Sequence, residues 1–164
     1  MRDKYGVSQD SYCYKNSDVL FNKLNIENHE SLAEAELAFT AIRFSEYSSK
    51  ITSINKFNLN HLQTLNFHLF QDVYDWAGDI RTVDIAKGAS RFCTCSRIDA
   101  EAHPFREGNG RTQRLFFEEL CFFLGLNITW PDISKEEWIK ANIDGYNGHL
   151  KSLEDIFTGA ISDI

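Results

Sequence analysis

Apolar residues recur every three or four positions along most of the chain, which predicts a mainly helical protein. Ser17 is placed to cap a short helix that continues through Leu24. Asn28 is placed to cap a longer helix that ends at about Tyr47. The predicted inward face of this longer helix consists of Leu32, Ala35, Phe39 and Ile42.

A third helical stretch follows a polar connection. Asn58 can cap it, and Gly78 is expected at its C-terminal end, where glycine adopts the left-handed conformation without strain. The apolar stripe of this helix consists of Leu62, Leu65, Leu69, Val73 and Trp76. His61 and His68 lie on the same helix, and we expect them to pack or to face solvent rather than to bind a ligand.

The period of the pattern changes after this helix. Apolar and polar residues alternate between Arg81 and Ile85. Lys87 and Gly88 then give a turn signal before a second extended stretch, Ser90 to Cys93. Alternation on both sides of a turn indicates a small β-hairpin.

The second half of the chain is again helical. The run from Leu115 to Leu124 is apolar almost all round, which is typical of a buried helix, and Gly125 is expected to end it. Ser134 and Glu137 predict a capping box before the next helix, and a last helix begins at about His149. The apolar residues of these last two helices are Trp138, Ile139, Ile143, Leu150, Leu153, Ile156, Phe157 and Ile161.

These elements predict one all-α domain, residues 1–164, with a small β-hairpin. We divide it into N-terminal helices (1–57), a helix with the hairpin (58–98), a loop with a core helix (103–124) and C-terminal helices (134–164). With 43% hydrophobic residues in 164, the chain has enough apolar material for a sizeable core.

Charge and cysteine content narrow the function classes. The net charge of −7 argues against a protein that coats nucleic acid, although one nucleotide could still bind in a locally basic pocket. The four cysteines (Cys13, Cys93, Cys95 and Cys121) lack zinc-ribbon spacing, so we expect free thiols in a reducing compartment. We find no apolar segment typical of a signal peptide or a membrane span, and we expect a cytoplasmic protein without membrane contact.

A dense group of glycines and polar residues stands directly before the apolar run 115–124. It reads His103-Pro104-Phe105-Arg106-Glu107-Gly108-Asn109-Gly110-Arg111, and Arg114 follows after two further residues. Because the apolar run begins at once, Gly108 to Gly110 are expected at a helix N-terminus, where unpaired backbone N–H groups and the helix dipole favour an anion. Glycine also lets the backbone approach a ligand closely. The segment therefore predicts a phosphate-binding loop.

Side chains of the same segment fit the chemistry of phosphate transfer. Arg111 and Arg114 are three residues apart, so both project from the first turn and can hold phosphate oxygens. Glu107 offers a carboxylate for Mg²⁺ that bridges a polyphosphate, and His103 offers a base of the type that titrates near neutrality. Each feature alone is common on protein surfaces, and it is their combination in one loop that favours a nucleotide site.

This segment resembles the signature of the Fic family (filamentation induced by cAMP), His-Pro-Phe-x-(Asp/Glu)-Gly-Asn-Gly-Arg-x-x-Arg, with every position filled. The opening from Asp10 to Leu24 is also similar to that of stand-alone bacterial Fic toxins. The resemblance implies a Fic-type helical bundle and a protein adenylyltransferase (AMPylator), which transfers AMP from ATP to a Ser, Thr or Tyr hydroxyl of a target protein.

The resemblance also implies roles for the residues of the motif. His103 would be the catalytic base, and Glu107 would hold Mg²⁺ against the α- and β-phosphates. The nucleotide would be bound by Gly108, Asn109, Gly110, Arg111 and Arg114, with the Asn109 side chain helping to stabilise negative oxygens. Pro104 and Phe105 would be structural, and Arg106 fills the variable position, to which we assign no role.

The predicted hairpin has a counterpart in the family. The preceding segment, Trp76-Ala77-Gly78-Asp79-Ile80-Arg81, resembles the family segment that leads into a hairpin called the flap. The edge of the flap docks the target protein by strand addition, which requires little sequence specificity. We expect Lys87, Gly88 and Phe92 to contribute to this docking.

The resemblance also suggests how such a protein is restrained. Many Fic proteins carry an inhibitory helix with the pattern (Ser/Thr)-x-x-x-Glu-(Gly/Asn), whose glutamate pairs with the second motif arginine. In this chain no Ser or Thr stands four residues before a Glu, so we expect no internal inhibitory helix. The resemblance implies instead a toxin restrained by a separate small antitoxin that covers the site near Arg114. Targets in that class include type II topoisomerases.

The chain departs from the family pattern just before the motif. Fic proteins have two helices between the flap and the motif, whereas here residues 99–102 alone separate Ile98 from His103. So few residues cannot form a stable helix, and the apolar run 115–124 would lack part of its cover. Either the chain has a deletion or the protein contains a further segment. Two alternative functions stay open: a Fic enzyme that transfers a different phosphate-containing group, and a catalytically impaired binding module.

Overall fold

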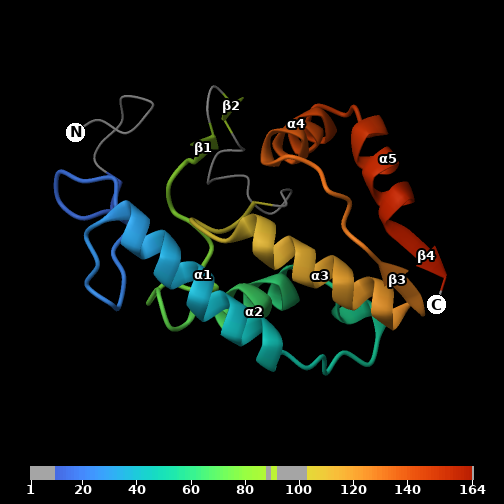
Figure 1. The fold of residues 1–164 in the computed structure, drawn as a ribbon, viewed down its shortest axis with the longest axis horizontal. Coiled ribbons are helices and arrows are strands. Elements are labelled where there is room, and N and C mark those ends of the chain that lie inside the picture. Colours follow the sequence, from blue (N-terminus) through green and yellow to red (C-terminus); the bar gives the residue numbers. More distant parts are fainter. Residues whose placement is uncertain (1–9, 88–89, 92–102, 164) are drawn as a thin grey trace. The chain divides into compact units, whose positions relative to one another are not determined.

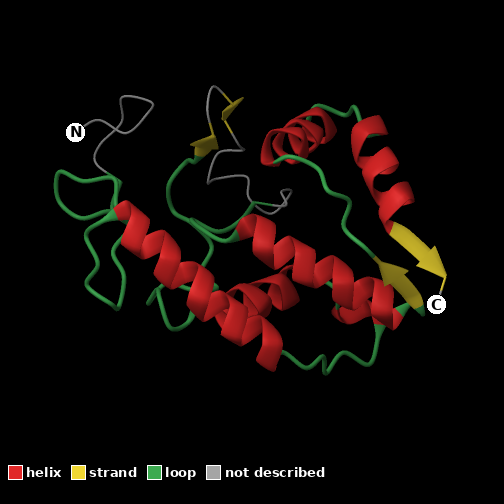
Figure 2. Cartoon of the chain, in the orientation of Figure 1, coloured by secondary structure: helices red, strands yellow, loops and turns green. Residues whose placement is uncertain are grey.

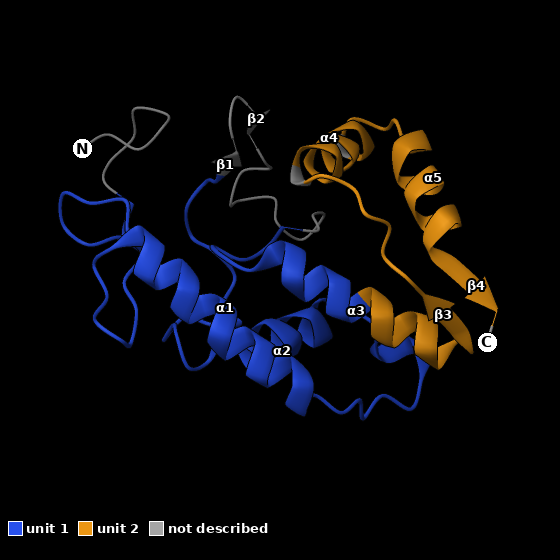
Figure 3. Ribbon diagram, viewed as in Figure 1, with its two compact units in different colours: residues 1–116 blue, residues 117–164 orange. Residues whose placement is uncertain are grey.

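The computed structural model describes residues 10–87, 90–91 and 103–163 (Figure 1). Within these ranges the chain forms five α-helices, a 3₁₀ turn at Ile54–Lys56 and two small antiparallel sheets (Figure 2). This agrees with the predicted all-α fold and its hairpin, and adds a second sheet. The chain divides into two compact units, residues 1–116 and 117–164 (Figure 3). Among the described helices, none combines the length and apolar character that crossing a membrane requires.

The first two helices begin where their caps predict. Helix α1 spans His29–Glu46, and the side chain of Asn28 accepts a hydrogen bond from the backbone N–H of Ser31 at 3.0 Å. Helix α2 spans Leu59–Phe70, and Asn58 caps it by accepting from His61 at 3.2 Å. These two bonds confirm the predicted N-caps.

Helix α2 ends earlier than predicted. Residues 71–78 form turns, so the expectation that the helix continues to Gly78 is wrong. The turns bring Gly78 back beside α2, where its carbonyl accepts from Gln63 at 3.0 Å and its N–H donates to Asn66 at 2.8 Å. A straight helix could not place Gly78 next to a residue that precedes it by four turns. Gly78 has a positive φ of 81° in this arrangement.

The predicted helix between Ser17 and Leu24 does not form. The Ser17 hydroxyl accepts from the backbone N–H of Val19 at 3.0 Å, a local bond that competes with helix formation. Cys13 and Leu20 form an isolated antiparallel bridge instead. This folded-back segment still delivers its apolar side chains to the core, since Val19 and Leu20 are both buried.

The core of the first unit gathers residues from the N-terminal segment, α1, α2 and the start of α3. It consists of Cys13, Val19, Leu20, Leu32, Leu65, Leu69, Phe70, Val73, Tyr74, Ala77 and Leu115. One predicted core position of α1 is wrong, because Ile42 is 53% exposed. The inward face of α1 instead includes Thr40, which is buried, and Arg43, which pairs with Asp72 at 2.6 Å. The hydroxyl of Thr40 donates to the carbonyl of Glu36 in the same helix at 2.6 Å, which satisfies the buried polar group.

A hairpin is present, but its first strand lies later than predicted: residues 81–85 form no strand, and Lys87, predicted in the turn, belongs to the first strand. Strand β1 (Ala86–Lys87) pairs with strand β2 (Ser90–Arg91), with Ala86 opposite Arg91 and Lys87 opposite Ser90. Several predictions lie outside the described residues: the roles of Gly88 and Phe92, the thiols of Cys93 and Cys95, and the short connection from Ile98 to His103.

The second unit contains the last two helices and the unpredicted sheet. Helix α3 spans Asn109–Phe123 and is shared between the units, and Gly125 follows its end with a φ of 73°. Helix α4 (Lys135–Tyr146) has the predicted capping box, and α5 spans Lys151–Ala160. Strand β3 (Leu126–Ile128) pairs with β4 (Ile161–Asp163).

Candidate active site

The motif glycines lie at the N-terminus of α3, as predicted. Helix α3 begins at Asn109, and Gly108 precedes it with a φ of 80°. A Cβ atom on Gly108 would lie 2.2 Å from the Phe70 ring, so no other residue fits there. A Cβ on Gly110 would meet no atom of the described residues within 4 Å, so packing in that part of the protein does not require this glycine. The motif loop thus packs against the Phe70 ring at Gly108.

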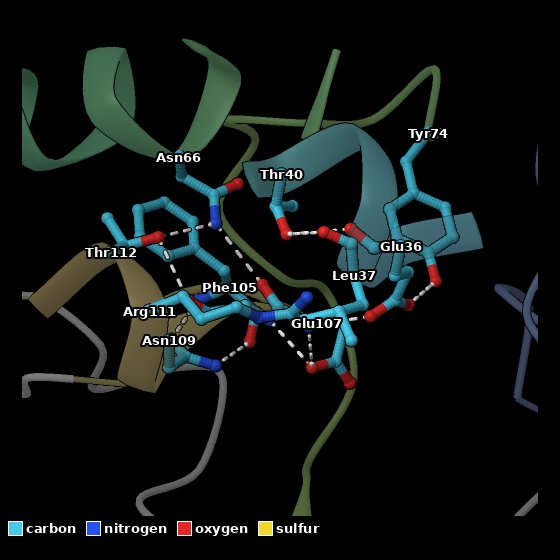
Figure 4. Close-up of polar contacts among 11 residues, drawn as sticks. Glu36, Leu37, Thr40, Asn66, Tyr74, Phe105, Glu107, Asn109, Arg111 and Thr112 are labelled. Carbon is cyan, nitrogen blue, oxygen red and sulfur yellow. Dashed lines mark hydrogen bonds and ion pairs between the residues drawn. The ribbon is translucent and has the colours of Figure 1, made fainter. Parts of the chain in front are cut away.

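The side chain of Asn109 closes the loop on itself. Its Oδ1 accepts from the backbone N–H of Phe105 at 2.9 Å, and its Nδ2 donates to the Phe105 carbonyl at 2.8 Å (Figure 4). The Phe105 side chain is 1% exposed and anchors the loop in the protein. In the structure Asn109 therefore braces the loop, a role beyond the phosphate contact that the motif implies.

Asn66 of α2 joins three parts of the site. Its Nδ2 donates to the carbonyl of Glu107 at 3.2 Å and to the hydroxyl of Thr112 at 3.0 Å (Figure 4). Its Oδ1 accepts from Gly78 at 2.8 Å. Because Asn66 is 1% exposed, these bonds satisfy a polar side chain that would otherwise be costly to bury.

Arg81, which precedes the hairpin, binds the first two residues of the motif. Its backbone N–H donates to the carbonyl of Pro104 at 2.8 Å, and its Nε donates to the carbonyl of His103 at 3.1 Å. Its Nη1 reaches the carbonyl of Val83 at 2.8 Å. Arg81 is 1% exposed, so the segment that leads into the hairpin and the segment that carries His103 are fixed to one buried guanidinium.

The variable motif position has a structural partner after all. Arg106 donates to Oδ2 of Asp10 through Nε at 2.9 Å and Nη2 at 2.8 Å. Asp10 also accepts from the backbone of Tyr12 at 2.9 Å, and the hydroxyl of Tyr12 accepts from the N–H of Thr82 at 3.2 Å. The N-terminal segment thus contacts both the motif loop and the chain that enters the hairpin.

The two motif arginines lie in different environments. Arg111 donates to Glu36 of α1 at 2.6 Å, lies 3.4 Å from Glu107 and has its guanidinium carbon 4.5 Å from the centre of the Phe70 ring. Arg114 is exposed on the next turn of α3. The hydroxyl of Tyr74 donates to the other oxygen of Glu36, and burial, followed by the Glu36 carboxylate, raises the pKa of Tyr74.

Glu107 is the carboxylate of the motif that a metal ion could use. Both of its contacts, the N–H of Gly108 at 2.9 Å and Arg111 at 3.4 Å, fall on Oε1. Within residues 10–87, 90–91 and 103–163, no cluster of three or more His, Cys, Asp or Glu side chains could form a complete metal site. A single carboxylate fits Mg²⁺, which is commonly bound by one or two carboxylates together with substrate phosphates and water.

Several residues that support the motif are not predicted by the sequence pattern. These are Asp10, Glu36, Asn66, Phe70 and Tyr74, together with the bracing role of Arg81. One signal was available: Glu36 stands a helical turn after the buried Leu32, so it lies on the inward face of α1. The other partners are brought together by packing, which leaves no pattern in the sequence.

Comparison with known proteins identifies the family. No family model matches the chain. The probable protein adenylyltransferase Fic of Escherichia coli K12 is 32% identical over 198 aligned positions, which cover 99% of this chain and 98% of the relative. The chain belongs to the Fic family. The protein adenylyltransferase VbhT of Bartonella schoenbuchensis is 34% identical to this chain. The alignment covers 89% of this chain and 38% of that longer relative.

Solved Fic domains share the fold. The N-terminal Fic domain of a putative cell filamentation protein from Bartonella quintana, solved with bound ADP, aligns with a TM-score of 0.77 and 27% identity over 93% of this chain and 94% of that one. BepC of Bartonella tribocorum, solved with bound AMPPNP, aligns with a TM-score of 0.78 over 93% and 97% of the two chains. At 20% identity the second match shows the fold alone.

Proposed function

We propose that this Fic protein is a protein adenylyltransferase that moves AMP from ATP to a hydroxyl side chain of a target protein. The observation that carries the proposal is the complete motif at the N-terminus of α3, on a chain that matches the E. coli relative from end to end. The names of the relatives and the ADP bound in the solved Fic domain from Bartonella quintana support the same chemistry.

In the proposed reaction the motif residues have separate tasks. His103 takes the proton of the target hydroxyl, whose oxygen then forms a bond to the α-phosphorus of ATP. The bond from that phosphorus to the bridging oxygen breaks, and pyrophosphate leaves. The backbone N–H groups of Asn109 and Gly110, at the N-terminus of α3, stabilise the negative charge on the phosphate oxygens. The N–H of Gly108, which donates to Glu107 at 2.9 Å, joins them once that bond opens.

Charged side chains complete the nucleotide site. Glu107 would hold Mg²⁺, which supplies positive charge to the α- and β-phosphates when it is bound. Arg114, which is exposed on the first turns of α3, binds the distal phosphates. Arg111 contributes positive charge beside them while it is held by Glu36.

We extend the proposal to the target and the regulator. The target protein carries the Ser, Thr or Tyr that is modified, and it docks along the β1–β2 hairpin near Lys87, Gly88 and Phe92. A separate small antitoxin covers the site near Arg114, and a type II topoisomerase subunit is the target to test first. We place the reaction in the cytoplasm, where ATP, Mg²⁺ and free thiols coexist.

Labelling with ATP tests the proposal directly. The protein is incubated with Mg²⁺, a host lysate and ATP that is radioactive at the α-phosphate, beside a His103→Ala control. A labelled protein band that requires His103 is expected. Parallel ATP labelled at the γ-phosphate separates the reactions, since a band only in that sample would mean phosphoryl transfer and would contradict adenylylation.

A second candidate, a binding module without catalysis, has one observation in its favour. The alignment with the E. coli relative runs over 198 positions, whereas this chain has 164 residues, so at least 34 positions of the alignment have no counterpart here. If those positions support catalysis in the relative, this chain would bind nucleotide but label no protein. Calorimetry with a non-hydrolysable ATP analogue, run beside the labelling, distinguishes this outcome from a protein that does not bind at all.

A further inference from the structure

We propose that Glu36 is a positioning residue that acts through Arg111 and keeps the carboxylate of Glu107 available for the metal–nucleotide complex. The inference rests on the proposed function, because it assigns a task in the same site. It starts from an imbalance of charge: Arg111 is one cation between two carboxylates, at 2.6 Å from Glu36 and 3.4 Å from Glu107 (Figure 4).

The contact with Glu36 is the stronger of the two. It is shorter, and the side chain of Glu36 is 12% exposed, compared with 38% for Glu107. Coulombic attraction grows as charges move closer and as water is excluded, so both differences favour the Glu36 pair. Arg111 is therefore bound mainly to α1 and only weakly to the carboxylate of its own motif.

Glu36 is itself fixed from the opposite side. The hydroxyl of Tyr74, a residue that is 1% exposed, donates to Oε1 of Glu36, while Arg111 uses Oε2 (Figure 4). The Phe70 ring lies against the guanidinium at 4.5 Å and also against Gly108. The buried tyrosine, the carboxylate and the ring together define where Arg111 can be.

Removal of the Glu36 charge would change the partner of Arg111. Among the described residues, Glu107 is the other carboxylate that forms an ion pair with Arg111, and a shift of less than an ångström would turn the 3.4 Å contact into a short ion pair. A short ion pair with Arg111 would neutralise part of the negative charge that Glu107 offers to a metal ion and would compete for its carboxylate oxygens. Glu36 thus acts as a counter-ion that leaves Glu107 to the metal.

An opposite role would be self-inhibition, in which Glu36 withholds Arg111 from a phosphate. The geometry disfavours it, because releasing Arg111 would leave a largely buried carboxylate without its cation, which is costly. The two roles also predict opposite effects of neutralising Glu36. Positioning predicts a weaker dependence of nucleotide affinity on Mg²⁺, whereas self-inhibition predicts a more active enzyme.

The test compares Glu36→Gln and Tyr74→Phe with Asp72→Asn. The last variant is a matched control, because Asp72 also pairs with an arginine of α1, Arg43 at 2.6 Å, but does not contact the motif. Calorimetry measures the affinity for a non-hydrolysable ATP analogue with Mg²⁺ and with EDTA. Labelling of a target over a range of Mg²⁺ concentrations and thermal unfolding are recorded in parallel.

For Glu36→Gln we expect the Mg²⁺-dependent gain in affinity to fall roughly tenfold, the scale typical for residues that support a metal ligand. For Tyr74→Phe we expect the Mg²⁺-dependent gain in affinity to fall by a smaller factor. This variant provides the test if Glu36→Gln does not fold. Asp72→Asn is expected to unfold at a lower temperature but to keep the wild-type Mg²⁺ dependence.

Three outcomes would overturn the inference: an unchanged Mg²⁺ dependence in Glu36→Gln, an increase in its activity, or a wild-type protein whose nucleotide affinity does not respond to Mg²⁺. Failure of the proposed function is distinguishable from these. In that case the wild-type protein labels no target, while the binding comparison among the three variants still decides the role of Glu36.

Discussion

Gly108 and Gly110 are two residues apart, yet they are glycines for different reasons. Gly108 has a positive φ and lies against the Phe70 ring, so the fold itself requires it. Gly110 lies in the first turn of α3 with open space where a Cβ would be. Among the described residues no packing contact requires the second glycine, and close approach of a phosphate to the backbone, as proposed, would account for it.

Alanine at these two positions should therefore separate folding from binding. We expect Gly108→Ala to lower the free energy of unfolding by at least about 2 kcal/mol, from backbone strain and overpacking. Gly110→Ala should retain stability or gain up to about 1 kcal/mol, because alanine favours a helix. It should nevertheless weaken binding of an ATP analogue, as measured by calorimetry beside thermal unfolding. Wild-type affinity in Gly110→Ala would contradict the assignment of this helix terminus as the phosphate site.

At the scale of elements, the motif loop is held by its neighbours rather than by its own sequence. Helix α2 contributes Asn66 to the backbone of the loop, and Arg81 binds the carbonyls of His103 and Pro104. The N-terminal segment adds Asp10. A catalytic base must be placed to within fractions of an ångström, so these bonds limit how far the loop can move.

The pair of Asp10 and Arg106 can be tested by a double-mutant cycle. Asp10→Asn, Arg106→Gln and the double variant are compared by denaturant unfolding and by the rate of target labelling. We expect a coupling free energy of about 1 kcal/mol, because the pair is only partly exposed and both nitrogens donate to one carboxylate oxygen. Additive effects of the two single changes would show that the N-terminal segment does not brace the loop.

The contact between α1 and the end of α2 should make stability depend on pH. The Arg43 guanidinium lowers the pKa of Asp72 below its ordinary value of 3.8. Because the pKa of Asp72 is lower in the folded than in the unfolded protein, the ionised carboxylate stabilises the fold at pH values above the ordinary pKa. This stabilisation is lost as the pH falls through the pKa of the folded state.

Asp72→Asn should consequently be less stable than the wild type at neutral pH, by about 1 kcal/mol. The difference should shrink as the pH falls below the ordinary range of aspartate, since the wild-type carboxyl then becomes neutral too. Chemical denaturation at a series of pH values measures this. A gap of constant size down to strongly acidic pH would exclude the ion pair as its cause.

At the scale of the whole molecule, the described site residues and their supports belong to the first unit, while the second unit has its own aromatic cluster. There Phe157 lies 4.9 Å from Phe117, 5.7 Å from Trp130 and 6.4 Å from Trp138, measured between ring centres. Two of the three tryptophans of the chain belong to this cluster, so their fluorescence reports on the second unit.

Phe157→Ala should destabilise the second unit by about 3 kcal/mol, through loss of aromatic packing. We expect tryptophan fluorescence to report unfolding at a lower temperature. Affinity for an ATP analogue, measured where the variant is still folded, should match the wild type, because the residues of the proposed nucleotide site belong to the first unit. A clear loss of affinity under those conditions would show that the second unit contributes to the site.

The sequence alone predicted the features that arise within one or two helical turns. Asn28, Asn58 and Ser134 cap helices because a side chain and a backbone N–H a few residues later form the bond, and both are visible in the sequence. The placement of the motif glycines at the start of α3 is equally local. The family resemblance came from the same contiguous residues and was confirmed by the relatives.

Tertiary structure decided the remaining features, because they depend on contacts between residues that are far apart in the chain. Ser17 has the chemistry of a helix cap, but long-range burial of Val19 and Leu20 folds its segment back. Helix α2 stops early because Asn66 and Gln63 bind Gly78. The sequence therefore determined which residues form the motif, and only packing determined that Glu36, 75 residues before Arg111, holds Arg111 beside them.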